Sequence, residues 1–397
     1  MRNRIIQFFK ENPVAVRFLW KMSRIIMTGW GWFVPIQKKT IIFCAFGGRK
    51  YDDSPKAIYD RICELDYFKN WRIIWAFAEP ERFEIPRGEK VQVDTLPFFK
   101  ALLYSKVWVS NSGMDRGIGL KRNCNIRVET WHGAPLKKIG GEEHQNSFGR
   151  DPKKVKGELD NSTIRCAQSE YDRAIFQRIM HATKDSFLLC DLPRNDSLLH
   201  YNKSDVTKIR EKIGVGANKK IILYAPTYRE YLIDKNHATY MAPPINLEKW
   251  EHELGGDYCL LIRAHYAVNA ALNIKDCDFV KNVSDYPYIN DLYAVSDVLI
   301  SDYSSSFIDY SILDRPMLCF AYDEKEYEEK RGLYIKLEEI LPSKVDYDED
   351  SLLNHILTLD YEKESQKTRV FHQKFAPYAG HASEKVVNEI IKRLENE

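Results

Sequence analysis

From residue 40 onward, short apolar runs rich in β-branched and aromatic residues alternate with segments in which apolar residues recur every three or four positions. The runs are typical of buried strands, and the periodic segments are typical of amphipathic helices. Strands that alternate with helices indicate parallel sheets covered by helices, so the predicted fold class is α/β. The predicted strands are Thr40–Phe46, Trp71–Phe77, Val107–Ser110, Asn125–Thr130, Thr163–Ala167, Phe187–Cys190, Lys220–Tyr224, Tyr258–Ile262, Asp278–Val280, Val298–Ser301 and Met317–Ala321.

These strands form two series, separated by a polar stretch with two glycines over residues 201–219. A chain of 397 residues is long enough for two or three domains. We therefore predict two Rossmann-like, doubly wound domains that face each other across a cleft. Residues 1–39 form an N-terminal segment, residues 40–205 the first domain and residues 206–397 the second. A C-terminal helix is predicted over Ala382–Leu394, and its single apolar face fits either domain.

The N-terminal segment has the pattern of a basic amphipathic helix. Asn12 and Pro13 suit the N-cap and the first helical position. The first 40 residues carry eight basic side chains and one acidic side chain, whereas the rest of the chain holds 51 basic and 56 acidic residues. Apolar residues lie on one stripe, at Ala15, Phe18, Leu19, Met22, Ile25 and Ile26, and cations on the opposite one, at Arg17, Lys21 and Arg24.

This helix and the following Trp30, Trp32 and Phe33 are predicted to lie in the interface of an anionic membrane, with the aromatic rings at headgroup depth. The longest uncharged run, Ile25–Gln37, has 13 residues, whereas a spanning helix needs about 20. Charges interrupt the apolar stretch, and no small-residue cleavage site follows it, so a signal peptide is disfavoured. The alternative is an ordinary helix that docks on the protein core.

Composition narrows the function classes. A net charge of +2 disfavours a dedicated nucleic-acid-binding protein. The eight cysteines are at least 18 residues apart, which excludes metal-type cysteine pairs, and most lie in apolar runs typical of buried cytosolic thiols. The chain has neither a Walker loop nor a Gly-x-Gly-x-x-Gly segment, which disfavours ATP hydrolysis and dinucleotide oxidoreduction. The carboxylate pairs Asp276/Asp278 and Asp346/Asp348 are interpreted as surface features, and we predict no metal or cofactor.

Ligands of open α/β sheets bind at the carboxyl ends of the strands, so polar motifs that directly follow strands are candidate sites. The sequence Trp-His-Gly-Ala-Pro-Leu-Lys-Lys-Ile-Gly at residues 131–140 follows the predicted strand Asn125–Thr130. His132 is a residue type suited to general base catalysis at neutral pH, and Lys137 supplies positive charge for phosphate oxygens. From these residues alone, a loop histidine with solvated lysines is an equal alternative.

Three further sets of strand ends carry polar groups. Arg263 and His265 are two residues apart, and in an extended segment their side chains point the same way. The serines Ser304–Ser306 lie between a strand and a helix, where they bind an anion or simply cap the helix. Basic segments lie at Pro193–Asp196 and Ala225–Arg229. Together these motifs predict a phosphate-rich ligand that spans the cleft.

With these motifs in this order and spacing, residues 120–335 resemble the CDP-glycerol glycerophosphotransferases, the teichoic-acid primases and polymerases of bacterial cell-wall synthesis. Two positions depart from the family pattern: Ala134 stands where threonine is usual, and Asp191 stands where a glycine often precedes the Leu-Pro-Arg-Asn-Asp run. The resemblance is carried by Trp131–Gly140, Pro193–Asp196, Tyr224–Arg229, Arg263–His265, and Asn290–Leu292 leading through Ser296–Asp297 into Ser301–Asp309.

The resemblance implies a GT-B type architecture, with an acceptor-side first domain and a CDP-donor-binding second domain. It implies transfer of glycerol phosphate from CDP-glycerol to a hydroxyl group of a polyprenyl-diphosphate-linked saccharide acceptor, with release of CMP and without a cofactor. The implied location is peripheral, on the cytoplasmic face of the bacterial cell membrane, which agrees with the charge of residues 1–39. The oligomeric state stays open, with a homo-oligomer among the alternatives.

By motif, His132 resembles the general base that takes the proton of the attacking hydroxyl group. His265 and Arg263 are expected to hold the donor diphosphate and to stabilise charge on the leaving CMP, and Ser304 and Ser305 are expected to bind phosphate. The further substrate-binding candidates are Asp302, Lys137, Arg194, Arg229, Thr227 and Asp309.

Three alternatives remain at this point. In the first alternative, the donor is CDP-ribitol rather than CDP-glycerol. In the second, the chain is a GT-B glycosyltransferase that uses a nucleotide sugar. In the third alternative the chain is a non-catalytic, membrane-associated protein that binds a wall polymer. Within the family, the sequence favours neither a primase nor a polymerase.

Overall fold

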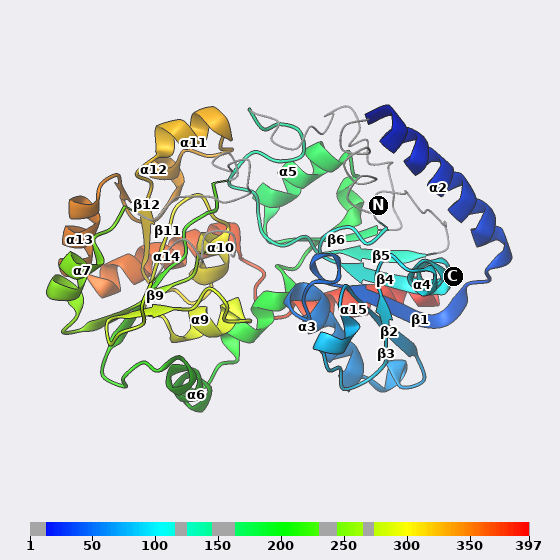
Figure 1. The fold of residues 1–397 in the computed structure, drawn as a ribbon, viewed down its shortest axis with the longest axis horizontal. Coiled ribbons are helices and arrows are strands. Elements are labelled where there is room, and N and C mark those ends of the chain that lie inside the picture. Colours follow the sequence, from blue (N-terminus) through cyan, green and yellow to red (C-terminus); the bar gives the residue numbers. More distant parts are fainter. Residues whose placement is uncertain (1–12, 116–124, 145–162, 230–243, 265–273, 397) are drawn as a thin grey trace.

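The computed structural model describes residues 13–115, 125–144, 163–229, 244–264 and 274–396, with side chains from residue 21 onward. The chain forms two β-sheets, one of seven strands and one of six, and helices pack on both faces of each (Figure 1). The two sheets correspond to the two predicted series of strands, and the α/β class is confirmed.

The first sheet contains β1 (Gln37–Cys44), β2 (Arg72–Phe77), β3 (Glu89–Gln92), β4 (Ser105–Ser110), β5 (Ile126–Glu129), β6 (Thr163–Ala167) and β7 (Phe187–Leu189). The second contains β8 (Lys220–Tyr224), β9 (Tyr258–Ile262), β10 (Val280–Asn282), β11 (Val298–Ser301), β12 (Met317–Phe320) and β13 (Val345–Asp346). The helices are α2 (Pro13–Phe33), α3 (Asp53–Glu64), α4 (Leu96–Tyr104), α5 (Glu170–Met180), α6 (Lys203–Ile213), α7 (Leu247–Leu254), α9 (Ile289–Val295), α10 (Ser306–Ser311), α11 (Glu324–Lys330), α12 (Leu337–Ile340), α13 (Glu349–Leu357), α14 (Tyr361–Phe375) and α15 (Ala382–Glu395). Short 3-10 helices are η1 (Phe46–Gly48), η2 (Asp66–Phe68), η3 (Pro80–Arg82), η5 (Lys184–Ser186) and η6 (Pro193–Leu199).

The first sheet has the strand order β3-β2-β1-β4-β5-β6-β7, and every neighbouring pair is parallel. Helices α3 and α15 cover one face, and α4 with the end of α2 covers the other. The run Ile41–Cys44 of β1 is buried throughout, because a parallel strand with helices on both faces has no solvent side.

The second sheet has the order β10-β9-β8-β11-β12-β13 and is also parallel. Successive side chains of β8 alternate between its two faces. Ile221 and Leu223 pack towards α6, α9, α10 and α14, whereas Ile222 and Tyr224 pack towards α7 and α13. All strands of both sheets run with their carboxyl ends towards the seam between the domains, where the polar loops meet.

The last helix, α15, leaves the second domain and packs on the first sheet (Figure 1). Its residues Ala382, Val386 and Ile390 are buried in the core that β1 and α3 share. Asp196 of η6 accepts hydrogen bonds from the backbone N–H groups of Ala382, at 2.8 Å, and Ser383, at 2.7 Å, and so caps this helix. The sequence left open which domain receives the helix, and the structure places it on the first.

Each of the eleven predicted strands has a counterpart, with Asp278–Val280 shifted to Val280–Asn282. The strands β3 and β13 were missed. β3 reads Glu-Lys-Val-Gln on an edge with three exposed positions, and β13 has two residues, so neither carries an apolar run. The predicted boundary between residues 205 and 206 falls in the first turn of α6, and the division into three segments stays a proposal.

Helix α2 lies along the outside of the first domain (Figure 1). Its Met27 and the following Val34 are buried against the core under α4. Large apolar side chains on α2 are nevertheless exposed, at Met22, Ile25, Ile26, Trp32 and Phe33. No helix in the described part of the chain is long and apolar enough to cross a membrane.

Candidate functional site

A cavity of about 830 Å³ lies at the seam, where the loops that follow β5, β8, β9 and β11 converge. Ligands of parallel sheets bind at this end of the strands. Six of the predicted site residues line the cavity, namely His132, Lys137, Thr227, Arg263, Ser304 and Ser305. The remaining ones, apart from His265, lie beside it and support its walls.

His132 faces the cavity from the loop after β5. Its Nδ1 lies 3.0 Å from the backbone oxygen of Asn111, so Nδ1–H donates this hydrogen bond and Nε2 carries the free lone pair. The ring stacks on Trp131 with a centroid distance of 4.7 Å, and Trp131 has a left-handed φ of 57°. Burial lowers the pKa of His132 below its usual range, which keeps the ring neutral and able to accept a proton at neutral pH.

Gly133 brings this loop against the second domain. Its φ is +145°, and a Cβ at this position would lie 2.3 Å from Ser305 Oγ. Only glycine allows such an approach. Ser305 occupies the N-cap position of α10 but makes no capping hydrogen bond, whereas Ser304 Oγ accepts the N–H of Ser306 at 3.1 Å. The hydroxyl group of Ser305 therefore lies opposite the His132 loop rather than serving its own helix.

Arg263 enters the cavity from the end of β9. Its Nη1 donates to the backbone oxygen of Tyr286, at 2.7 Å, which fixes the guanidinium group against the loop after β10. Burial lowers the pKa of Arg263, a sign that this cation lies in a poorly hydrated position. The predicted partner His265 lies outside the described residues.

Arg194 joins the two domains. Its Nη1 lies 2.7 Å from Asp53 at the start of α3, and its Nη2 lies 2.5 Å from Asp309 of α10 in the second domain. Nη1 also donates to the backbone oxygen of His132, at 3.1 Å. The guanidinium group of Arg194 and the carboxylate of Asp309, both predicted to bind substrate, are thus engaged with each other at the seam.

Two amide side chains connect Asp309 to a third carboxyl group, that of Asp191. Gln168 Nε2 donates to Asp191, at 2.7 Å, and to Asp309, at 3.2 Å, while Asn195 Nδ2 donates to the same two oxygens at 3.3 and 2.9 Å. Gln168 Oε1 accepts the N–H of Ala134 at 3.2 Å, which ties the His132 loop to this cluster. We call Asp53, Gln168, Asp191, Arg194, Asn195 and Asp309 the seam cluster.

Asp191 is fully buried and has a left-handed φ of 69°. Glycine, the residue that the family pattern leads us to expect here, adopts this conformation freely, and aspartate tolerates it better than most residues. Burial, and then the neighbouring Asp309, raise the pKa of Asp191 to about 8. The side chain is therefore a neutral acid at neutral pH.

A network of ion pairs and hydrogen bonds behind the cavity wall contains Arg229, Asp302 and Thr227. The Arg229 guanidinium group is paired with Asp302, at 2.9 Å, and with Asp323, at 2.7 Å, and is almost fully buried. Its carbon Cζ lies 4.9 Å from the centre of the Tyr303 ring. Asp302 Oδ1 accepts the N–H of Thr227 at 2.8 Å. Of these three predicted residues, only Thr227 reaches the cavity.

On the far side of the cavity, the two domains are in contact again, through the backbone of residues 136–138 and 332–334. The backbone of Lys137 pairs with Leu333 as an antiparallel bridge, Lys138 N donates to Gly332 O at 2.9 Å, and Tyr334 N donates to Leu136 O at 2.8 Å. The loop after His132 is therefore hydrogen-bonded along its backbone to the second domain.

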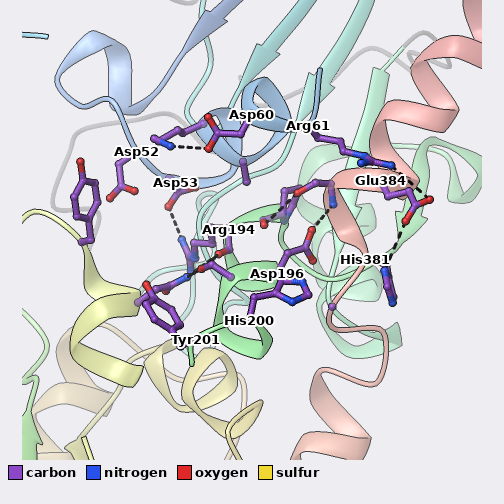
Figure 2. Close-up of a pocket in the computed structure, with 18 of the residues that line it drawn as sticks. Asp52, Asp53, Asp60, Arg61, Arg194, Asp196, His200, Tyr201, His381 and Glu384 are labelled. Carbon is purple, nitrogen blue, oxygen red and sulfur yellow. Dashed lines mark hydrogen bonds and ion pairs between the residues drawn. The ribbon is translucent and has the colours of Figure 1, made fainter. Parts of the chain in front are cut away.

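A second cavity, of about 740 Å³, lies on the other side of Arg194 and is shown in Figure 2. Most of its charged groups are engaged with one another. Lys56 pairs with Asp60 at 2.6 Å, and Glu384 lies 3.9 Å from Arg61. Asp52 is drawn without such a partner in Figure 2. The paired lining makes this cavity a weaker candidate for phosphate than the first, which is lined by Arg263, Lys137 and three serines.

The described residues contain no group of three or more His, Cys, Asp or Glu side chains that could hold a metal ion. The interpretation of Asp346 as a surface residue was wrong. It is fully buried and accepts a hydrogen bond from His355, at 2.6 Å, because it ends the short strand β13 beneath α13.

Sequence reasoning missed the loop after β1. Phe46, Gly47 and Gly48 all have positive φ, and Phe46 approaches His132 with a centroid distance of 5.9 Å. The signal was present as two glycines and two cations, Gly-Gly-Arg-Lys at 47–50, directly after a predicted strand. Gln168 and Asn111, which hold the His132 loop, carry no such signal, because isolated amides are common in loops.

Comparison with known proteins places the chain in a family. The sequence model of CDP-glycerol:poly(glycerophosphate) glycerophosphotransferases matches residues 26–392. The chain is 30% identical to a teichoic acid poly(glycerol phosphate) polymerase of Staphylococcus epidermidis over 90% of its own length, and spans about half, 51%, of that protein. It is 30% identical to a teichoic acid glycerol-phosphate transferase of Staphylococcus aureus, with 89% of this chain and 93% of that protein covered.

A solved structure of a variant of the wall teichoic acid polymerase TagF, soaked with CDPG, superposes on this chain with a TM-score of 0.84 at 28% identity, covering 100% of this chain and 99% of that one. The chain belongs to the CDP-glycerol:poly(glycerophosphate) glycerophosphotransferase family, as the sequence resemblance predicted.

Replacement of Asp191 by Asn is expected to flatten the pH dependence of stability. The pKa of Asp191 is about 8 in the folded protein and about 3.9 in an unfolded chain. Its contribution to stability is therefore complete below about pH 4 and is lost as the pH rises towards about 8. Between about pH 5 and pH 9, the melting temperature of the wild type should fall relative to that of Asp191→Asn.

The control is Asp185→Asn, which removes an exposed carboxylate far from the seam. Parallel melting curves for wild type and Asp191→Asn across this range would show that Asp191 is ionised in the folded protein.

Proposed function

We propose that this chain transfers glycerol phosphate from CDP-glycerol to a hydroxyl group of a polyprenyl-diphosphate-linked saccharide acceptor and releases CMP. The observation that carries the proposal is the position of His132, whose free Nε2 faces a cavity lined on the opposite domain by Arg263, Ser304 and Ser305. Family membership and the names of the relatives support the choice of donor. The two sheets with their sites at facing carboxyl ends support a GT-B type architecture.

In the proposed reaction, His132 Nε2 takes the proton of the acceptor hydroxyl group as its oxygen attacks the phosphorus of the glycerol phosphate. The bond between this phosphorus and the oxygen of the CMP phosphate breaks, and CMP leaves with the electron pair. The transition state of phosphoryl transfer spreads negative charge over oxygen atoms, so the main contributions of the protein are position and positive charge. Arg263 supplies that charge, with His265 as its predicted partner.

The serines Ser304 and Ser305 are proposed to donate hydrogen bonds to the donor phosphates. Lys137, which lines the same cavity, adds positive charge on the acceptor side. We assign supporting roles to the buried ion pairs, because a guanidinium group that is already engaged by two carboxylates has little left for a substrate. Arg194 and Asp309 hold the domains in register, and Arg229 and Asp302 hold the segment Tyr303–Ser305.

We also propose that the protein works peripherally on the cytoplasmic face of the membrane, where a polyprenyl-linked acceptor is anchored. The exposed apolar side chains of α2 at Ile25, Ile26, Trp32 and Phe33 support this proposal. Lys21 and Arg24 are exposed on the same helix, which suits contact with anionic headgroups.

Release of CMP tests the reaction. Purified protein is supplied with a lipid-linked disaccharide acceptor, with or without a first glycerol phosphate, and with CDP-glycerol, CDP-ribitol or UDP-sugars in parallel. We expect CMP release from CDP-glycerol and growth of the acceptor by at least one glycerol phosphate. Release from CDP-ribitol alone, or reaction with a UDP-sugar alone, would replace the proposed donor, and the length of the product separates a primase from a polymerase.

Replacement of His132 by Ala should lower kcat by about 100-fold or more, as the loss of a general base does, with the Kd for CDP-glycerol changed by less than about threefold. The matched control is His381→Ala, which removes an exposed histidine that lines the second cavity. A His132→Ala enzyme with near wild-type kcat would remove His132 from the proton transfer.

The combined variant Ile25→Ser, Ile26→Ser, Trp32→Ser and Phe33→Ser should weaken binding to vesicles of anionic phospholipid by about 10-fold or more, since it removes apolar surface and no charge. Vesicle co-sedimentation measures the effect. A control, Leu357→Ser with Val370→Ser, removes exposed apolar side chains elsewhere. Equal binding of the combined variant and the wild type would place the membrane contact outside α2.

A further inference from the structure

The loop after β1 is held in an unusual conformation beside His132. Phe46, Gly47 and Gly48 have φ values of 48°, 65° and 90°. Such a run of left-handed residues is strained for Phe46 and persists only where surrounding contacts impose it. Phe46 N donates to Asn111 Oδ1 at 2.8 Å, and Gly47 N donates to Ser112 Oγ at 3.0 Å.

The same loop is anchored to the sheet on its other side. Gly48 O accepts the N–H of Ala78 at 2.7 Å, and a Cβ on Gly48 would lie 2.8 Å from that nitrogen. Lys50 then pairs with Ala45 through an antiparallel bridge. The backbone that carries Lys50 is therefore fixed relative to the loop after β4, the loop whose backbone oxygen orients His132.

The side chain of Lys50 is exposed and lies over the ring of Phe46, the residue that packs beside His132. Its Nζ lies 5.3 Å from the centre of the Phe46 ring, and that ring is 5.9 Å from the ring of His132. Among the described residues Lys50 forms no ion pair within 4.0 Å, and the carboxylates that act on its charge from a greater distance are those of Asp52 and Asp53. A lysine that extends along an aromatic ring without an acidic partner keeps its charge available for a ligand.

Arg263 is the cation that the second domain supplies at the end of β9, and it lines the cavity that His132 faces. Burial, and then the positive charge of Arg263, lower the pKa of Lys50. Of the carboxylates that act on these cations, Asp53 is already held by Arg194, and burial raises the pKa of Asp52, which weakens its ability to neutralise them. Two like charges that lie near each other repel, and an anion bound between them removes this repulsion.

We infer that Lys50 and Arg263 form a phosphate-binding pair that spans the two domains beside His132. This inference rests on the proposed function for the identity of the phosphate, which belongs either to the diphosphate of the donor or to a phosphate of the acceptor. In this arrangement the first domain binds the phosphate through Lys50, and the second domain binds it through Arg263.

Binding of inorganic pyrophosphate to the full chain tests the pair without reference to turnover. By calorimetry, Lys50→Met should raise the Kd for pyrophosphate by about 10-fold to 100-fold, because a charge-assisted hydrogen bond to phosphate is lost. Lys50→Arg should restore most of the affinity. The matched control is Arg49→Met, which removes the neighbouring exposed cation of the same loop and should change the Kd by less than about threefold.

Kinetics with CDP-glycerol and the lipid-linked acceptor separate the two sources of phosphate. If Lys50 holds the donor, Lys50→Met raises the Kd and KM for CDP-glycerol and leaves the KM for the acceptor unchanged. If it holds the acceptor, only the KM for an acceptor that already bears glycerol phosphate rises.

Unchanged pyrophosphate affinity together with unchanged KM values in Lys50→Met, shown to be folded by its melting temperature, overturns the inference. Absence of turnover with every CDP donor, combined with weakened pyrophosphate binding in the variant, rejects the proposed function and leaves the phosphate pair standing.

Discussion

The arrangement of the site depends on Arg194, a cation of the 3-10 helix η6 that pairs with carboxylates of both domains. Asp53 lies at the start of α3 on one side, and Asp309 lies in α10 on the other. Removal of one partner from a buried ion pair typically costs about 3–5 kcal/mol, because the remaining charge is left without compensation. Opening of the seam at this point breaks the pair of Arg194 with Asp309 but lets water solvate both charges, so it costs less than removal of one partner. In the closed seam, the two pairs of Arg194 fix α10 relative to η6 and α3.

The contacts of Arg194 also fix the segments that carry His132 and Ser305 relative to each other. Arg194 also binds the backbone oxygen of His132, and Gln168 ties both Asp309 and the N–H of Ala134 to the cluster. His132 and Ser305 belong to different domains, yet Gly133 and Ser305 touch. The roles proposed for His132 and Ser305 require such a fixed reference, since small misplacements of reacting groups lower rates strongly.

The sequence analysis identified the features that short-range residue patterns encode, namely the strands and the polar residues at their ends. Apolar runs located the strands, and the rule that ligands bind at strand ends led to His132, Arg263 and Ser305, which the structure brings to one cavity. It did not distinguish the cations that line the cavity from the cations that are held in buried ion pairs. Arg194 meets its partner Asp309 from 115 positions away along the chain, and no periodicity reports a contact of that kind. The sequence analysis did not single out Lys50, because its position over the Phe46 ring depends on the left-handed backbone of residues 46–48, which only the folded loop reveals.

The return of α15 to the first sheet gives the polypeptide two crossings between the domains, one through η6 and one just before Ala382. Asp196 in the first crossing holds the N–H groups at the start of the second, so the crossings are fastened side by side. A domain that is connected to its neighbour at two adjacent points has less rotational freedom than a domain connected at one point. The double connection therefore limits rotation of the second domain about the seam, and it favours the orientation in which Ser305 lies against Gly133, beside His132.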